Sequence, residues 1–246
     1  MWLSESGELI NMKILAFDTS NQTLAAAVLD DQQTIAAFQL NRKMNHSLTL
    51  MPAIEHVMKI SGLTPKDLDR IVVAQGPGSY TGIRIAVTTA KTLANTLDIE
   101  LVGISSLKSI AANTKDPRLI VPIMDARRNN VYAGIYKWED GQLNEIFKDQ
   151  HISLELLLSE IKEDAIFVGE AKKFAEQILA VLPTAEVEVD DQINLPNGVT
   201  LGRLGSRAEP VTDIQGFVPT YLKRVEAEEK WLETHQPGNE NYVEKI

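Results

Sequence analysis

Cysteine is absent from this chain of 246 residues. Its absence excludes disulfides, thiolate nucleophiles and cysteine-based metal sites, and it is typical of proteins of the reducing cytosol. The histidines supply no metal site either, because no two of them have the i, i+4 spacing of ligands on one helix: His46, His56, His151 and His235. We therefore expect a cytoplasmic protein with no metal ion.

Long apolar runs are also missing, since no stretch reaches the roughly 18 residues that a membrane helix needs. Glu5 and Glu8 stand where a signal peptide has basic residues. We interpret residues 1–11 as a disordered extension, as an upstream start codon would produce. The apolar fraction of 44% and the charged fraction of 24% are those of a globular protein, and the length suffices for two modest domains.

Positive charge is in short supply, because the formal net charge is −10. Nucleic-acid backbones are held by clustered lysine and arginine, and an acidic field opposes their approach. Local basic pairs remain, such as Arg127-Arg128 and Lys172-Lys173, but pairs of this kind are typical of solvated surface. The chain alone is therefore not expected to hold RNA over a broad surface.

The first half of the chain alternates strand and helix patterns. An antiparallel meander is predicted from three strands with a tight turn at Asp30-Asp31: Lys13–Asp18, Leu24–Leu29 and Gln33–Leu40. Strands Ile71–Ala74 and Glu100–Ile104 are expected to alternate with three helices: His46–Ile60, Ile83–Leu97 and about Ser106 to Asn113. This alternation favours a parallel or mixed sheet with helices packed on it.

The second half repeats the pattern from about Asp116. The predicted strands are Leu119–Met124, Val131–Trp138, Leu143–Phe147 and Ala165–Val168, and the predicted helices are Leu154–Ile161, Ala171–Leu182 and one that follows Leu195–Gly198. Each half begins with paired strands and ends with helices. We therefore predict a duplicated α/β protein with lobes at 12–115 and 116–216, and a helical tail at 217–246 that packs back on the lobes and frays at its end.

Two short motifs follow predicted strands. Gly76–Gly82 leaves a strand and enters a helix, where backbone amides favour an anion, but it lacks the Gly-Lys-Ser/Thr of a Walker loop. Asp18-Thr19-Ser20 places an acid before two hydroxyls, as in kinases whose strand-end aspartate handles a metal ion or water. Each motif has a plain structural alternative, a glycine-rich turn for the first and an Asx or Ser/Thr turn for the second.

The order of the motifs resembles the bacterial TsaB family. Asp18-Thr19-Ser20 is followed by Gly76–Arg84 running into Ala90–Ala94, then by Asp125–Arg128 with Val131–Ala133, and by Pro219–Arg224, so that the resemblance covers about residues 12–231. It implies the two-lobed fold of sugar kinases, Hsp70 and actin. It also implies a heterodimer with TsaD, the paralogue that transfers a threonylcarbamoyl group to the adenosine beside the anticodon of tRNA. A TsaE-like P-loop ATPase would join a larger complex, tRNA would be contacted only through that complex, and the chain alone would form a homodimer.

The resemblance further implies a non-catalytic subunit with no cofactor. Ser106 and Ile110 stand where the metal-binding histidines of the catalytic paralogue would be, and Asp125–Arg128 replaces its glycine-rich phosphate turn. Bulky side chains there would crowd a phosphate. We therefore interpret the nucleotide site as vestigial and assign it to Asp18, Thr19, Ser20, Gly76, Gly78 and Gly82, with no catalytic residue. The alternative is an active small ATPase or kinase that uses Asp18 and Gly76–Gly82. A peptidase is disfavoured because the chain has no recognisable nucleophile pairing.

The partner is expected to bind the helices His46–Ile60 and Ile83–Leu97. The predicted interface comprises Leu48, Met51, Ile54, Val57, Met58, Ile83, Ala86, Ala90 and Ala94. Small residues at i, i+4 allow another helix to approach closely. The same stripe could instead pack on the chain's own sheet, and the sequence leaves both readings open.

Overall fold

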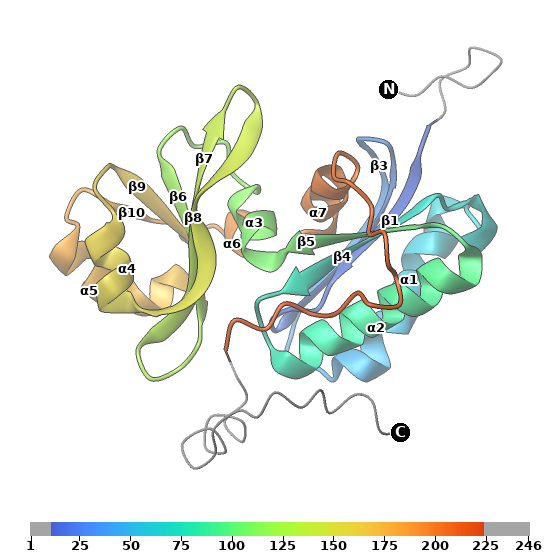
Figure 1. The fold of residues 1–246 in the computed structure, drawn as a ribbon, viewed down its shortest axis with the longest axis horizontal. Coiled ribbons are helices and arrows are strands. Elements are labelled where there is room, and N and C mark those ends of the chain that lie inside the picture. The colour runs from blue at the N-terminus through green and yellow to red at the C-terminus, as the bar shows by residue number, and fades with distance from the viewer. Residues whose placement is uncertain (1–10, 224–246) are drawn as a thin grey trace.

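The computed structural model describes residues 11–223, which form two lobes around two five-stranded sheets (Figure 1). The first sheet has the order β3-β2-β1-β4-β5. Its strands are β1 Lys13–Asp18, β2 Thr23–Asp30, β3 Gln33–Asn41, β4 Arg70–Gly76 and β5 Glu100–Ser105. The first three are antiparallel and the last two run parallel to β1, so the predicted meander and mixed sheet are confirmed.

The second sheet repeats this topology with the order β10-β9-β6-β7-β8. Its strands are β6 Leu119–Asp125, β7 Asn130–Glu139, β8 Gln142–Ser153, β9 Ala165–Gly169 and β10 Glu186–Val187. Again the first three are antiparallel, and the last two run parallel to β6. The duplicated α/β architecture predicted from the sequence is therefore present.

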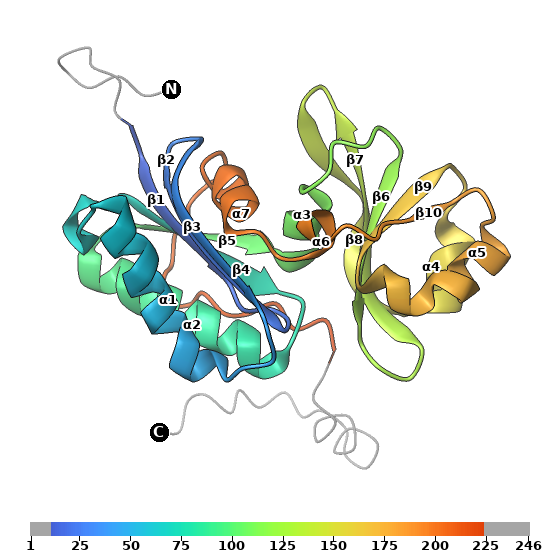
Figure 2. The same ribbon diagram turned by 180° about the vertical axis from the view of Figure 1, so that it is seen from behind.

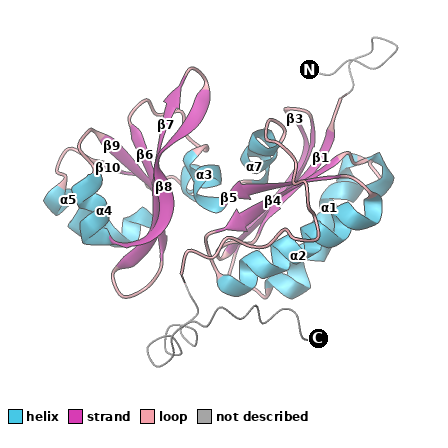
Figure 3. Cartoon of the chain, viewed as in Figure 1, coloured by secondary structure: helices cyan, strands magenta, loops and turns pink. Residues whose placement is uncertain are grey.

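Helices cover both faces of each sheet (Figure 3). On the first sheet α1 His46–Ser61 and α2 Tyr80–Leu97 share one core with the strands, and on the second α4 Leu154–Glu160 and α5 Ala175–Val181 do the same. Three short helices lie between these elements, namely η1 Pro65–Asp67, η2 Glu170–Phe174 and α6 Asp191–Asn194. The predicted helix Ala171–Leu182 is divided between η2 and α5. No helix in the described residues is long and apolar enough to cross a membrane.

The last helix of each half packs on the sheet of the other half. α3 Ser106–Ala111 follows β5 but buries Leu107 and Ile110 against the second sheet. α7 Gly198–Gly205 follows β10 but buries Leu201 against the first sheet (Figure 2). Arg70 of β4 donates a hydrogen bond to the Gly205 carbonyl over 2.7 Å and ties α7 to this face. α7 therefore packs on the first lobe, although its residues fall in the range 116–216 that was predicted as the second.

The segment after α7 returns along the first lobe. Residues 217–223 were predicted to begin a helical tail, but they are not helical. Instead, the Thr220 amide donates a hydrogen bond to the Gln75 carbonyl at the end of β4 over 2.8 Å. The rest of the predicted tail and nearly all of the predicted N-terminal extension lie outside the described residues.

Candidate functional site

A cleft of about 1010 Å³ lies between the two lobes. The first lobe lines it with residues that follow β1, with the turn between β4 and α2, and with Lys43, Met44 and His46. The second lobe contributes the turn after β6 together with Glu170 and Lys173, and Thr220–Lys223 close one side. The structure thus brings together both motifs that the sequence singled out. It adds the 220–223 segment, whose sequence pointed to this site only through the family resemblance.

The two motifs contact each other directly. The Ser79 amide donates a hydrogen bond to the Ser20 carbonyl over 2.6 Å, and the Thr19 hydroxyl donates to the Gly82 carbonyl over 2.8 Å. A Cβ atom on Gly78 would lie 2.2 Å from the Ser20 oxygen, and one on Gly82 would lie 2.1 Å from the Thr19 oxygen. The glycines therefore permit two backbone turns to pack against each other.

Asp18 is completely buried and is not among the residues that line the cleft. Its Oδ1 accepts a hydrogen bond of 2.6 Å from the Ser20 amide, which is a local Asx-type contact. Burial raises the pKa of Asp18 to about 6, although this amide and the charge of His46 act in the opposite direction. The carboxyl is therefore covered by Ser20 and its own turn, and a ligand in the cleft would meet Ser20 first.

The turn after β6 presents acidic as well as basic groups. Three successive residues have left-handed backbones, Arg127 at φ 67°, Arg128 at 53° and Asn129 at 58°. Asp125 accepts a hydrogen bond of 2.8 Å from the Arg127 amide, and Glu170 accepts one of 2.8 Å from the Asp125 amide. Lys173 lies 3.1 Å from Glu170 and 3.6 Å from Asp125. Two carboxylates, both paired with Lys173, thus lie where the resemblance places the phosphate turn of the paralogue.

The described residues contain no group of three or more histidine, aspartate or glutamate side chains arranged to hold a metal ion. Lys43, Arg127 and Lys223 add positive charge along the cleft. Tyr80 and Tyr221 stack beside it with their ring centroids 4.9 Å apart. The aromatic pair joins the start of α2 to the 220–223 segment and fixes this side of the cleft.

The residues predicted for a partner interface fall into two groups. Leu48 is 72% exposed and Met51 is 49% exposed on α1. The other seven are buried in the core between the helices and the first sheet: Ile54, Val57, Met58, Ile83, Ala86, Ala90 and Ala94. The alanine stripe lets α2 lie close to its own sheet, and among the residues of the predicted interface only Leu48 and Met51 of α1 expose apolar surface.

Two mixed sheets of matching topology, with a cleft between them and exchanged helices, define a protein of the two-lobed actin, hexokinase and Hsp70 class. A crystal structure of YeaZ from Pseudomonas aeruginosa has this fold, with a TM-score of 0.74 at 22% sequence identity over 86% of this chain and 100% of that one. Residues 34–231 match the family model of TsaD, described as a tRNA N6-adenosine threonylcarbamoyltransferase.

Sequence relatives specify the family further. The tRNA threonylcarbamoyladenosine biosynthesis protein TsaB of Bacillus subtilis is 42% identical over 92% of this chain and 100% of its own length. TsaB of Escherichia coli is 28% identical over 52% of this chain and 57% of its own. The chain belongs to the TsaB family.

Proposed function

We propose that this chain is a non-catalytic subunit of the complex that forms threonylcarbamoyladenosine in tRNA, and that it acts by binding a TsaD-like catalytic paralogue. Membership of the TsaB family supports a role in the biosynthesis of threonylcarbamoyladenosine. The observation that carries the non-catalytic role is the direct packing of the two motif turns, in which Ser79 and Thr19 use their hydrogen bonds on backbone carbonyls rather than on a ligand. A phosphate between the turns would have to separate them.

The vestigial character of the nucleotide site is part of this proposal. Asp18 is buried behind its turn, and an aspartate that positions a metal ion or water must reach the reacting atoms. This burial disfavours the alternative of a small ATPase or kinase built on Asp18 and Gly76–Gly82.

The surface proposed to bind the paralogue is the exposed apolar side of α1 near its start, which carries Leu48 and Met51. These side chains are 72% and 49% exposed. A standard interface buries about 1,600 Å² in total, and its apolar centre carries most of the binding free energy. α1 is 16 residues long and packs beside α2, so the pair supplies a rigid helical face of suitable size.

The remaining parts of the proposal concern the assembly. A TsaE-like P-loop ATPase is expected to join the heterodimer, and tRNA is expected to be contacted only through the complex, in the cytoplasm. Without its paralogue the chain is expected to form a homodimer. The net charge of −10 supports the indirect contact with tRNA.

Reconstitution of tRNA modification, omitting this chain or the paralogue in turn, tests the function. Modification is expected to require both chains, and Asp18→Ala is expected to leave the rate within a few-fold of wild type. A loss of about a thousandfold, which corresponds to roughly 4 kcal/mol of transition-state stabilisation, would mark Asp18 as catalytic and refute the proposal. ATP turnover by the purified chain that disappears in Asp18→Ala would establish the ATPase alternative.

A further inference from the structure

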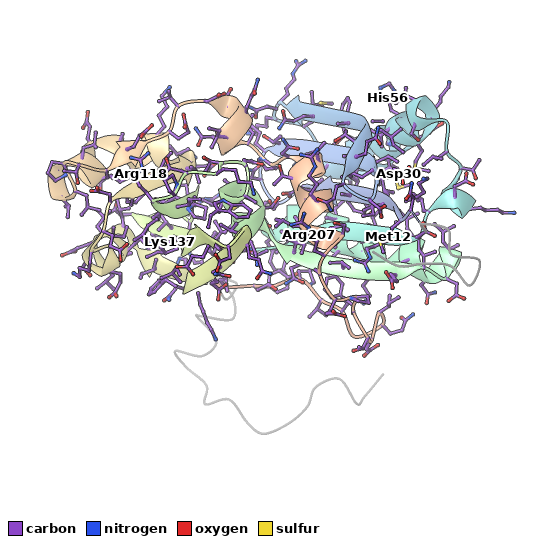
Figure 4. The ribbon with its side chains drawn as sticks, turned by 90° about the horizontal axis from the view of Figure 1, so that it is seen from above. Met12, Asp30, His56, Arg118, Lys137 and Arg207 are labelled. Atoms are coloured by element: carbon purple, nitrogen blue, oxygen red, sulfur yellow. The ribbon has the colours of Figure 1, made fainter. Side chains whose placement is uncertain are left out.

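A second cavity, of about 460 Å³, lies between α7 and the β7–β8 hairpin and shares no lining residue with the cleft. Four basic side chains line it, Lys108, Lys115, Arg203 and Arg207, together with Trp138. Figure 4 shows Arg207 near α7, between the two lobes. The cavity volume is within the range of about 300–1,000 Å³ that is typical of small-molecule sites.

The charge of this cavity is opposite to that of the chain. The sequence has 34 acidic and 24 basic residues, yet no aspartate or glutamate is among the lining residues. Within residues 11–223, none of the four basic side chains forms an ion pair. Lys108 acts electrostatically on Asp149, but that carboxylate already accepts hydrogen bonds from Ser105 and Tyr136. Positive charge is therefore in excess here, although Asp149 offsets part of it at Lys108.

The indole of Trp138 holds one of the four cations in place. The Lys115 ammonium lies 3.0 Å from the centroid of its ring, and the indole N–H donates a hydrogen bond of 2.8 Å to the Thr114 carbonyl. Burial and the neighbouring Arg207 both lower the pKa of Lys115. The cation–π contact offsets only part of the repulsion between the positive charges of Lys115 and Arg207. An anion that enters the cavity would relieve the rest of this repulsion.

We infer that this cavity binds a small, multiply charged phosphate compound. Guanidinium groups donate in a planar fork that fits phosphate oxygens, and lysine ammonium groups add point charges. Arg203 uses one N–H on the Gln32 carbonyl at 3.1 Å, which leaves its other N–H groups for a ligand. The small volume and the acidic net charge favour a small compound over a nucleic-acid strand.

The ligand would bridge the two lobes. Lys108 lies on α3 and Lys115 follows it, and α3 packs on the second sheet. Arg203 lies on α7 and Arg207 follows it, and α7 packs on the first sheet. An anion bound to both pairs would therefore stabilise one relative position of the lobes.

Inorganic triphosphate is the probe, used with the full chain at about 0.15 M salt. Trp2→Phe and Trp231→Phe leave Trp138 as the single tryptophan, so its fluorescence reports on this cavity. We expect saturable binding with a change in Trp138 emission. Calorimetry is expected to show that Lys115→Gln with Arg207→Gln weakens binding about a hundredfold, since each charged hydrogen bond contributes about tenfold.

Lys43→Gln with Lys173→Gln is the matched control, because it removes two positive charges from the cleft instead. This pair is expected to leave binding unchanged, and thermal melting of both pairs is expected to show folded proteins. Loss of binding in the control pair, equal weakening in both pairs, or no saturable binding would overturn the inference. Tighter binding of a single-stranded oligonucleotide that depends on Lys115 and Arg207 would overturn the assignment to a small compound.

Discussion

Leu48→Asp separates binding of the paralogue from folding. Leu48 is 72% exposed and lies in the first turn of α1, just after the capping residue Asn45, where no acidic residue is present. Exposed substitutions usually change the free energy of unfolding by no more than about 0.5 kcal/mol. A carboxylate in the first turn of a helix is itself favourable by about 0.3–1 kcal/mol. The variant is therefore expected to be as stable as wild type or slightly more so.

Binding of the paralogue, in contrast to folding, is expected to be weakened by Leu48→Asp. Removal of a leucine from an interface forfeits about 1.5–3 kcal/mol of apolar burial, and an unpaired carboxylate adds a desolvation cost. A total loss of about 3 kcal/mol weakens binding about a hundredfold. Calorimetric titration with the TsaD-like paralogue measures this loss, and size-exclusion chromatography checks whether the complex still forms.

Leu156→Asp provides the matched control, because Leu156 is a 59% exposed leucine on α4 of the other lobe. It is expected to retain wild-type affinity. If Leu48→Asp binds as tightly as wild type while remaining folded, the proposed surface on α1 is wrong. Equal losses in both variants would show that added negative charge alone weakens the complex.

Ala90→Glu addresses the alternative that the sequence left open. Ala90 is completely buried in the core beneath α2, so a glutamate there is expected to unfold the chain, because domains have only about 5–15 kcal/mol of net stability. Circular dichroism would report this directly. A folded Ala90→Glu variant that has lost only its partner would mean that α2 turns this face outward.

Three further predictions concern the cleft and tRNA. Asp18 has a folded pKa of about 6 against 3.8 for the free group, so its contribution to stability is complete below about pH 4 and is lost as the pH rises through 6. Asp18→Asn should remove this pH dependence and raise the free energy of unfolding, measured with urea at pH 7.5, by roughly 2 kcal/mol over wild type. If the stabilities of the variant and of wild type change with pH in parallel, Asp18 is not a buried carboxyl with a raised pKa. Gly82→Ala should destabilise by about 1–3 kcal/mol although alanine favours helices, because its Cβ would lie 2.1 Å from the Thr19 oxygen; an increase in melting temperature would refute the close packing. The isolated chain should bind tRNA with a dissociation constant of about micromolar or weaker at physiological salt, and a tight complex in a mobility assay would be the contrary result.

The strands of both sheets were predictable because their signal is local. Apolar, β-prone runs such as Lys13–Asp18 and Ile71–Ala74 match β1 and the centre of β4. The grouping of the two motifs in one site was implied only by the family resemblance, and the structure explains it, since β1 and β4 are parallel neighbours whose ends lie at the same edge. The two-residue strand β10 was missed because it is too short to show alternation.

The placement of whole helices was not predictable in this way. An apolar stripe shows that a helix face is buried and does not show what covers it. Ala86, Ala90 and Ala94 fit a partner's helix and their own sheet equally well by spacing, and only the folded chain shows the sheet beneath them. The crossing of α7 to the first sheet depends on long-range contacts such as Arg70 with the Gly205 carbonyl, 135 residues apart.

Glycine motifs have the same ambiguity at the level of function. A glycine beside a strand end can make room for a phosphate or for another backbone segment, and the sequence pattern is the same in both cases. The distance from the missing Cβ to its nearest neighbour distinguishes them. At Gly78 and Gly82 that neighbour is a carbonyl of the Asp18-Thr19-Ser20 turn, at 2.2 Å and 2.1 Å. Hydrogen bonds from Ser79 and Thr19 close the same gap. The motif that most resembles a phosphate loop therefore joins two turns of one lobe, as the proposed non-catalytic role predicts.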